Sequence, residues 1–369
     1  MPYRPVPLTP LVAGLPATVP FVGPEALQRQ SGKTFRLRLG ANESTFGPSP
    51  QALAAMRAAA ERISYYADPE NYELHVALAA HHGVSPDEVA AGSGIDDLLG
   101  WVVRAYLGTG DVAVTSLGAY PTFNYHVTGF GGQLELVPYR DDRNDLEALA
   151  AAARQHRARL VFLANPDNPT GSWYAAGMVR AFLDALPEEC LLLLDEAYCD
   201  FAPADELLPL DTRDPRIIRL RTFSKAYGMA GARIGYAITP AETISAFERI
   251  RLHFGVNLVA QEGALAALGD TSYLAQVVAE VARGREEYAA LGHALGLTPL
   301  PSSTNFVSFD TGSPERAAAL TTTLAAQGVF IRMPGAPPLN RCIRVTVGTP
   351  EERRAFAEIL RAVLPALPE

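Results

Sequence analysis

The alternation of apolar and polar positions divides the chain into a long region of mixed strands and helices and a shorter region rich in helices. Between residues 89 and 255, short apolar runs alternate with stretches of helical spacing, most of them about a dozen residues long. The runs expected to form strands are 112–115, 134–137, 160–164, 190–195, 216–221 and 233–238, with helices such as 145–156 and 174–185 between them. Runs 160–163 and 191–194 are apolar at every position, as is typical of strands buried on both faces. The alternation therefore predicts a mostly parallel sheet with helices on both faces.

After residue 258 the pattern changes. Alanine-rich helices are expected at 258–268 and 271–295, followed by strands at 305–309, 329–332 and 342–347 and by helices at 314–326 and 350–364. This succession predicts a small C-terminal α+β domain over residues 258–369, beside a large domain over 46–257. Residues 1–45 are rich in proline, and we expect an arm, extended or with a short helix, that contributes to the small domain.

Composition narrows the class of protein. Apolar residues make up 48% and charged residues 19% of the chain, which is typical of a soluble globular protein with a large core. The net charge of −9 and the lack of a basic stripe argue against nucleic acid as a partner. No run approaches the ~18 apolar residues of a membrane span, and prolines interrupt the apolar N-terminus, unlike a signal peptide. We therefore expect a cytoplasmic protein without a membrane segment.

The cysteines and histidines do not indicate a metal site. Cys190, Cys199 and Cys342 form no Cys-x-x-Cys pair. The seven histidines show no spacing typical of metal ligands. Buried free thiols in a reducing compartment, and no metal, are the expectation.

Lysine is almost absent from the chain, which makes Lys225 a candidate for chemistry. The sequence has 31 basic residues, and Lys33 is the only other lysine. Arginine stays protonated at any working pH, whereas a lysine amine can lose its proton and act as a nucleophile. Taken alone, a lone lysine is more often a solvated side chain in a turn, so the case depends on its surroundings.

Polar groups directly follow several predicted strands, at the edge where open parallel sheets bind ligands. Strand 160–164 leads into a proline-rich turn that can hold the amide of Asn168 against a ligand. Strand 190–195 ends at Asp195, and a carboxylate there is costly to bury without a positive partner. Each feature also has a purely structural interpretation, as a rigid turn and as a helix N-cap.

Other candidates suit an anion. Gly94, Ile95 and Asp96 open the helix expected at 96–107, and a glycine-containing helix start presents free N–H groups to an anion, although many helix starts look the same. The strand expected at 216–221 is followed by two hydroxyls, the lysine and an arginine, namely Thr222, Ser224, Lys225 and Arg233. Hydroxyls and a guanidinium close to a lysine make a good anion site.

Together these groups describe one ligand. Its phosphate suits the helix start, the hydroxyls and the arginine. Its basic ring nitrogen suits Asp195, its ring oxygen suits Asn168 and Tyr198, and its aldehyde suits Lys225. Pyridoxal 5′-phosphate has all four features, and a lysine Schiff base with an aspartate at the ring nitrogen is the expected contribution of the protein.

On these residues, the sequence resembles the fold type I pyridoxal-phosphate-dependent aminotransferases of classes I and II, and most closely the histidinol-phosphate aminotransferase family. The matching segments run through nearly the whole chain: 42–49, 66–69, 94–97, 120–121, 165–171, 195–198, 224–225 with Arg233, and 344–349. The resemblance implies an α/β fold with a large cofactor-binding domain and a smaller α+β domain. It also implies ping-pong transamination in histidine biosynthesis, from histidinol phosphate and 2-oxoglutarate to imidazole acetol phosphate and glutamate.

The resemblance assigns roles at the cofactor. Lys225 would form the Schiff base and shuttle protons, and Asp195 would keep the ring nitrogen protonated. Tyr198 and Asn168 would bond the ring oxygen, and Tyr120 would stack on the ring. The remaining cofactor-binding positions are Gly94, Ile95, Asp96, Thr222, Ser224 and Arg233.

The resemblance also points to a partner subunit and a substrate. Tyr66 matches a tyrosine that reaches the cofactor phosphate from the other subunit, which implies a homodimer with shared active sites. Arg344 would clamp a substrate α-carboxylate, and Arg332 lies where the family binds the substrate phosphate. Phe46 and Asn305 match positions near the substrate, although packing and a turn are their simpler interpretations, as a surface cation is for Arg332.

Three departures bear on the substrate. Ser44–Thr45 replaces the usual Asn-Pro, Ile95 replaces a Ser or Ala, and segment 333–338 is short. Aromatic or other amino acids are therefore alternative amino donors. A decarboxylase of the threonine-phosphate type is an alternative enzyme class, because the motifs around the cofactor barely separate the two. A non-catalytic regulator is a third, but 369 residues leave no room for its DNA-binding domain, and the acidity argues against it.

Overall fold

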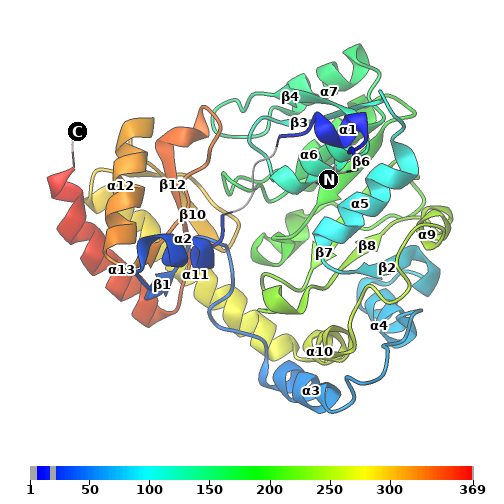
Figure 1. Ribbon diagram of the computed structural model, residues 1–369, viewed down its shortest axis with the longest axis horizontal. Helices are drawn as coiled ribbons and strands as arrows, with labels where there is room; N and C mark the ends of the chain where they lie inside the picture. Colours follow the sequence, from blue (N-terminus) through cyan, green and yellow to red (C-terminus); the bar gives the residue numbers. More distant parts are fainter. Residues whose placement is uncertain (1–5, 17–21, 368–369) are drawn as a thin grey trace, which may run out of the picture.

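The computed structural model describes residues 6–16 and 22–367 and shows two lobes (Figure 1). The larger lobe contains a seven-stranded sheet, and the smaller lobe contains a three-stranded sheet beside the C-terminal helices. The 24-residue helix α11 (Thr271–Ala294) runs from the larger lobe into the smaller one. No helix within the described residues is long and apolar enough to cross a membrane.

The large sheet has the strand order β2-β8-β7-β6-β5-β3-β4. Its strands are β2 (Val89–Gly92), β3 (Val112–Ser116), β4 (Gln133–Val137), β5 (Leu160–Ala164), β6 (Leu191–Asp195), β7 (Ile217–Thr222) and β8 (Gly235–Ile238). β8 runs antiparallel to both of its neighbours, and the other pairs are parallel. The carboxyl ends of β5, β6 and β7 therefore meet at one edge of the sheet, where ligands bind in open α/β folds.

The sequence predicts six of these seven strands, and the mostly parallel sheet is confirmed. Leu192 and Leu194 pack in one core cluster and Leu193 in another, so β6 is buried on both faces as expected. The prediction missed β2, whose four residues are small. The reversed direction of β8 was also not foreseen. β8 is antiparallel because residues 223–234 connect it to β7 without an α-helix, whereas parallel neighbours need a longer crossover.

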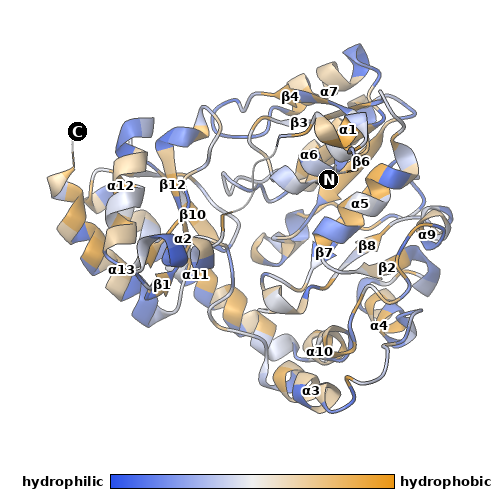
Figure 2. Ribbon diagram, viewed as in Figure 1, coloured by the Kyte–Doolittle hydropathy of each residue, from blue (hydrophilic) through white to orange (hydrophobic). Residues whose placement is uncertain are grey.

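Helices cover both faces of the large sheet. α7 (Leu146–Gln155) and α8 (Ala176–Ala185) pack on one face, and α5 (Ile95–Tyr106), α6 (Pro121–Gly129) and α9 (Ala241–Glu248) pack on the other. A third cluster joins α3 (Pro50–Ala60), α4 (Tyr72–His82) and α10 (Leu258–Gly269) to the β2 edge. Figure 2 shows apolar residues concentrated in the strands, and buried clusters lie on both faces, which places the core on both sides of the sheet.

The smaller lobe has an antiparallel sheet of strand order β12-β10-β9. Its elements are β9 (Thr298–Pro299), β10 (Phe306–Asp310), α12 (Pro314–Ala326), β12 (Cys342–Thr346) and α13 (Pro350–Val363). In the N-terminal segment, α1 (Pro10–Ala13) and α2 (Pro24–Ser31) precede β1 (Leu37–Arg38), which pairs with β11 (Val329–Phe330). The N-terminal segment thus contributes a strand to the smaller lobe. The three cysteines are buried free thiols, as expected.

Candidate active site

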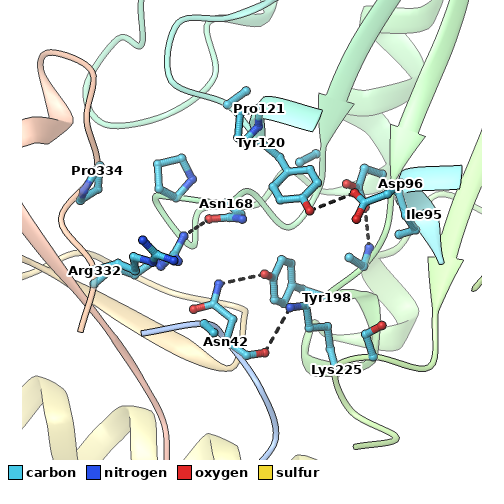
Figure 3. Close-up of a pocket in the computed structure, with 18 of the residues that line it drawn as sticks. Asn42, Ile95, Asp96, Tyr120, Pro121, Asn168, Tyr198, Lys225, Arg332 and Pro334 are labelled. Carbon is cyan, nitrogen blue, oxygen red and sulfur yellow. Dashed lines mark hydrogen bonds between the residues drawn. The ribbon is translucent and has the colours of Figure 1, made fainter. Parts of the chain in front are cut away.

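A cavity of about 530 Å³ lies between the two lobes, at the carboxyl ends of β5, β6 and β7 (Figure 3). Its volume is in the range of small-molecule sites. Twelve of the residues singled out in the sequence line it: Ile95, Asp96, Tyr120, Asn168, Asp195, Tyr198, Thr222, Ser224, Lys225, Arg233, Arg332 and Arg344. Residues that are far apart in the sequence therefore face one space.

Lys225 lies in the loop that follows β7, with its amine inside the cavity. Its Nζ donates to the backbone oxygen of Asn42 over 3.2 Å and lies 5.6 Å from the centre of the Tyr198 ring. Figure 3 shows this amine between Asn42 and the opposite wall that carries Asp96 and Tyr120. The amine thus faces groups that can hold a ligand, which excludes the solvated turn.

Asp195 ends β6 at the base of the cavity. Its side chain is 6% exposed, and burial raises the pKa of its carboxyl to about 7. The Ala197 backbone N–H donates to Oδ1 over 2.9 Å. A cationic group on a ligand would stabilise the ionised carboxylate in this buried position.

The next residue, Glu196, points away from the cavity and forms the ion pairs in this region. Arg219 donates to it through Nε over 3.0 Å, and Arg221 donates through Nε over 2.8 Å. These arginines hold the pKa of Glu196 at about 2 although its burial acts in the opposite direction. The two adjacent carboxylates are therefore different: Glu196 is neutralised by the protein, and Asp195 is left for a ligand.

An anion subsite lies at the start of α5. Gly94 has φ +86°, and a Cβ on it would lie 2.5 Å from Nη2 of Arg233. Glycine therefore lets the guanidinium lie against the helix start, where the first backbone N–H groups have no helical partner. The Thr222 hydroxyl donates to Oγ of Ser224 over 2.9 Å, which gathers two hydroxyls at the same place. This cradle of N–H, hydroxyl and guanidinium groups fits a phosphate.

Tyr120, Asn168 and Tyr198 form walls of the cavity that also contains Lys225 (Figure 3). The Tyr120 hydroxyl donates to Oδ1 of Asp96 over 2.9 Å, and burial raises the pKa of this phenol. Asn168 accepts from Arg344 through Oδ1, which leaves its amide nitrogen to donate to something else. Flat side chains with donor groups thus surround a space that fits a ring with a polar oxygen.

Two arginines from the smaller lobe complete the cavity. Arg332 and Arg344 are adjacent across an antiparallel bridge, and the backbone N–H of Arg332 donates to Arg344 over 3.2 Å. Burial lowers the pKa of Arg344 to about 10, and the nearby charge of Arg332 acts in the same direction. Arg344 donates to the backbone oxygen of Gly40 over 3.1 Å and to Asn168, both of them uncharged acceptors. Two cations this close together favour an anionic ligand.

Four predicted site residues do not line the cavity. Gly94 acts from behind the anion subsite, as described above. Asn305 donates to the backbone oxygen of Asn42 over 3.0 Å and so lies behind the wall. Phe46 is partly buried against the core, as its packing interpretation predicts. Tyr66 is 82% exposed, and its ring centre lies 4.6 Å from that of Phe254, on the surface of the chain.

Two features of the cavity could not be predicted from the sequence. Asn42 belongs to the matching segment 42–49, but nothing in the sequence indicates that it contacts Lys225 and Tyr198. The segment Met333–Ala336 lines the cavity from the smaller lobe, although the sequence showed only that it is short. Contacts between the lobes leave no local pattern in the sequence.

Comparison with known proteins gives a consistent result. Residues 36–360 match the family described as aminotransferase class I and II. A crystal structure of histidinol-phosphate aminotransferase from Sinorhizobium meliloti, in complex with pyridoxal-5′-phosphate, is 51% identical in sequence. It superposes with a TM-score of 0.94 and covers 97% of this chain and 98% of that one.

Curated relatives agree over nearly the whole length. Histidinol-phosphate aminotransferase 2 of Carboxydothermus hydrogenoformans is 35% identical over 364 residues, covering 98% of both chains. Histidinol-phosphate aminotransferase of Roseiflexus castenholzii is 36% identical and covers 96% of this chain and 98% of its own.

Proposed function

The chain belongs to the class I and II aminotransferase family, and we propose that it is a pyridoxal-phosphate-dependent histidinol-phosphate aminotransferase. In this reaction an amino group moves from histidinol phosphate to 2-oxoglutarate, which gives imidazole acetol phosphate and glutamate. The observation that carries the substrate is the pair Arg332 and Arg344 beside Lys225 in one cavity. The relatives named above support the same assignment.

The residues of the cavity fit the cofactor. The cradle of Gly94, Thr222, Ser224 and Arg233 would hold its phosphate, and the Asp195 carboxylate would face its ring nitrogen. When bound, pyridoxal phosphate supplies an aldehyde that takes up an amino group and a ring that withdraws electrons from the reacting carbon.

Asp195 and Lys225 would each control a different proton in the reaction. The Asp195 carboxylate, buried and without an ion-pairing side chain among the described residues, would hold a proton on the ring nitrogen because two opposite charges stabilise each other in a buried position. The Lys225 amine lies on a flexible stem inside the cavity. It would take the proton from the substrate carbon that bears the amino group, and it would return a proton to the corresponding carbon in the other half of the reaction.

Asn168 and Tyr120 orient the ring. The Asn168 carbonyl oxygen is engaged by Arg344, so its amide N–H groups are available to the ring oxygen. The Tyr120 hydroxyl is engaged by Asp96, so its ring presents a face to the cavity. Each side chain has one polar group fixed by the protein, which leaves a defined surface for the cofactor.

The two arginines would bind the anionic ends of the substrates. Histidinol phosphate carries a phosphate and no carboxylate, so Arg332 would bind this phosphate in the first half of the reaction. 2-Oxoglutarate and glutamate carry two carboxylates, and Arg344 would clamp the one next to the reacting carbon through its planar fork of N–H donors. One pair of cations thus serves both halves of a ping-pong reaction.

The homodimer is part of the same proposal. Tyr66 belongs to an exposed apolar surface that also includes Ile63, Tyr65, Leu252 and Phe254. Exposed patches of large apolar side chains mark interaction sites. We expect this surface to pack on a second copy, where Tyr66 would reach the cofactor phosphate of the partner. Sedimentation equilibrium checks this, because a monomer at micromolar concentration would contradict the shared site.

The substrate is tested by following the visible absorbance of the bound cofactor in single half-reactions. Histidinol phosphate and phenylalanine are mixed separately with the holoenzyme, without any acceptor. We expect both substrates to abolish the absorbance. The concentration of histidinol phosphate that is needed should be lower than that of phenylalanine by roughly tenfold or more, because one charged contact is worth about that factor. Equal concentrations would point to a general aminotransferase, and release of carbon dioxide would point to a decarboxylase.

A further inference from the structure

Asn42 lies at the centre of the hydrogen bonds around Lys225 and Tyr198. It follows β1 in the linking segment between the lobes, is 2% exposed and has φ 54°. This left-handed backbone is uncommon for residues other than glycine, and asparagine is among the few side chains that tolerate it. A buried asparagine in this conformation indicates a specific demand on both its backbone and its side chain.

The backbone and the side chain of Asn42 reach the two groups that face the cofactor. Its carbonyl oxygen accepts from Nζ of Lys225 over 3.2 Å. Its Nδ2 donates to the hydroxyl oxygen of Tyr198 over 2.9 Å, a bond that Figure 3 shows at the edge of the cavity. One residue therefore contacts both the reactive amine and the phenol that lies beside it.

Asn42 is itself held by the smaller lobe. Its backbone N–H donates to Oγ1 of Thr346 over 3.1 Å, and its carbonyl oxygen also accepts from Asn305 over 3.0 Å. Thr346 lies on β12, the strand that carries Arg344. The position of the Asn42 amide is thus fixed by the lobe that binds the substrate, while its contacts point to the lobe that binds the cofactor.

The hydrogen-bonding capacity of a phenol makes the Tyr198 contact informative. A tyrosine hydroxyl has one proton to donate and can accept through its oxygen. Because Asn42 donates to that oxygen, the Tyr198 proton is left for another acceptor, and Tyr198 lines the cavity. We propose that Asn42 is a positioning residue that makes Tyr198 a hydrogen-bond donor toward the ring oxygen of the cofactor and holds Lys225 at the reacting face.

The inference rests on the proposed binding of pyridoxal phosphate beside Tyr198. A hydrogen bond donated to the ring oxygen stabilises the negative charge there and so favours the deprotonated form of the bound cofactor. Loss of Asn42 should weaken this donation. The pH midpoint of the cofactor's visible absorbance should then move to a higher value, which is a readout that does not depend on turnover.

The experiment is a pH titration of the absorbance of the holoenzyme and its variants. Asn42→Gly keeps the left-handed backbone and the carbonyl but removes the donor, and we expect the midpoint to rise by about half to one pH unit. Asn42→Asp places an acceptor at the same position, which draws the Tyr198 proton away, so the rise should be larger. Glycine adopts the positive φ of position 42 without strain, and aspartate keeps the size of the side chain, so the two variants perturb folding in different ways.

A double-mutant cycle separates positioning from general damage. Tyr198→Phe should raise the midpoint alone, and adding Asn42→Gly to it should change the midpoint no further, because Asn42 acts through Tyr198. Asn71→Gly is the matched control. Asn71 is also buried and left-handed, at φ 52°, but accepts from Gln261 and does not line the cavity. It should lower stability without moving the midpoint.

The outcomes distinguish the two proposals. A midpoint that Asn42→Gly leaves unchanged while Tyr198→Phe raises it overturns the role of Asn42 and leaves the cofactor placement intact. Additive shifts in the double variant overturn it as well. A midpoint that Tyr198→Phe does not move overturns the placement of the cofactor beside Tyr198, and the role of Asn42 with it.

Discussion

Asp195 and Arg344 are buried ionisable groups whose pKa values are shifted in opposite directions by burial. Burial raises the pKa of the Asp195 carboxyl to about 7 and lowers the pKa of the Arg344 guanidinium to about 10. Both shifts mean that the protein alone disfavours the charged form. A ligand that brings a cation to Asp195 and an anion to Arg344 relieves both. These residues are therefore arranged for ligands of opposite charge at the two ends of one cavity.

The raised pKa of Asp195 predicts how the cofactor-free protein responds to pH. An aspartate in an unfolded chain has a pKa of about 3.9, so between about pH 4 and pH 7 the folded state binds more protons than the unfolded state. The stability contributed by the protonated carboxyl is then present at low pH and lost as the pH rises through about 7. The substitution Asp195→Asn removes the titrating carboxyl and with it this loss. The cofactor-free variant should therefore gain roughly 2 to 4 kcal/mol relative to the parent between about pH 4 and pH 8.

Denaturant unfolding of both cofactor-free proteins at the two pH values measures this difference. Asp184→Asn, at an exposed carboxyl that does not line the cavity, is the matched control and should show no such trend. An equal response of all three proteins would contradict the buried, unpaired state of Asp195. With cofactor bound, the order should reverse, because the charge partner of the carboxylate is then present.

Single residues differ in how far the sequence revealed them. Lys225 and Asp195 could be predicted because a rare residue type and a costly charge sit directly at the ends of apolar strands. Asn42 could not, because its importance comes from bonds to Lys225 and Thr346, which lie 183 and 304 positions away in the sequence. A polar side chain in a loop looks the same whether it bonds to water or to a catalytic group.

Among the elements, the start of α5 is the one whose geometry is most specific. Gly94 has no side-chain cap to satisfy the first N–H groups of the helix, and its lack of a Cβ lets Arg233 approach. A helix start with unsatisfied N–H groups and an adjacent guanidinium is a preorganised anion site. The element thus contributes to binding through its backbone rather than through a side chain.

Gly94→Ala should weaken cofactor binding more than it destabilises the fold. A Cβ would force the flexible Arg233 guanidinium out of the cradle, and the positive φ would cost about 1 kcal/mol. We expect the dissociation constant for pyridoxal phosphate to rise about tenfold or more, which corresponds to the loss of one charge-assisted hydrogen bond. Titration of the cofactor-free protein, followed by absorbance, measures it.

Gly110→Ala is the matched control for this variant. Gly110 has nearly the same φ of +88°, and a Cβ on it would meet nothing within 4 Å. It should therefore lose a similar amount of stability and keep its affinity for the cofactor. Equal affinities for the two variants would show that the approach of Arg233 to the helix start does not matter for binding.

Elements were predicted well where their pattern is local. β5 and β6 are unbroken apolar runs, and their predicted bounds agree with the structure to within a residue. β2 was missed because Val89–Gly92 is short and made of small residues, which carry little strand signal. The direction of β8 depends on the connection that precedes it. The sequence of this connection, which contains Lys225, does not reveal that it forms a loop without an α-helix.

At the scale of the whole molecule, the cavity exists because the two lobes face each other. The larger lobe supplies the groups around Lys225, and the smaller lobe supplies Arg332, Arg344 and the segment 333–336. The side chain of Arg332 also donates to the backbone oxygen of Val22 over 2.8 Å, which brings the N-terminal segment to the same place. The proposed substrate site is thus built from both lobes and the N-terminal segment.

This assembly explains why the cofactor could be predicted from the sequence more securely than the substrate. The cofactor groups follow strands of one sheet, whose order fixes where they meet. The substrate groups come from the other lobe, and their distance from Lys225 depends on how the lobes pack. Phe46 and Asn305 show the difference, since both match substrate positions in the sequence but lie outside the cavity wall.

The most direct test of the proposed substrate is the effect of Arg332→Ala on two half-reactions of the holoenzyme. Loss of one guanidinium–phosphate contact should lower kcat/KM for histidinol phosphate by roughly 10- to 100-fold and leave that for phenylalanine within about twofold. Arg332→Lys, which keeps the charge but not the planar fork, should fall between. Equal losses for both substrates in Arg332→Ala would contradict the account, because Arg332 would then support the fold of the cavity rather than recognise a phosphate.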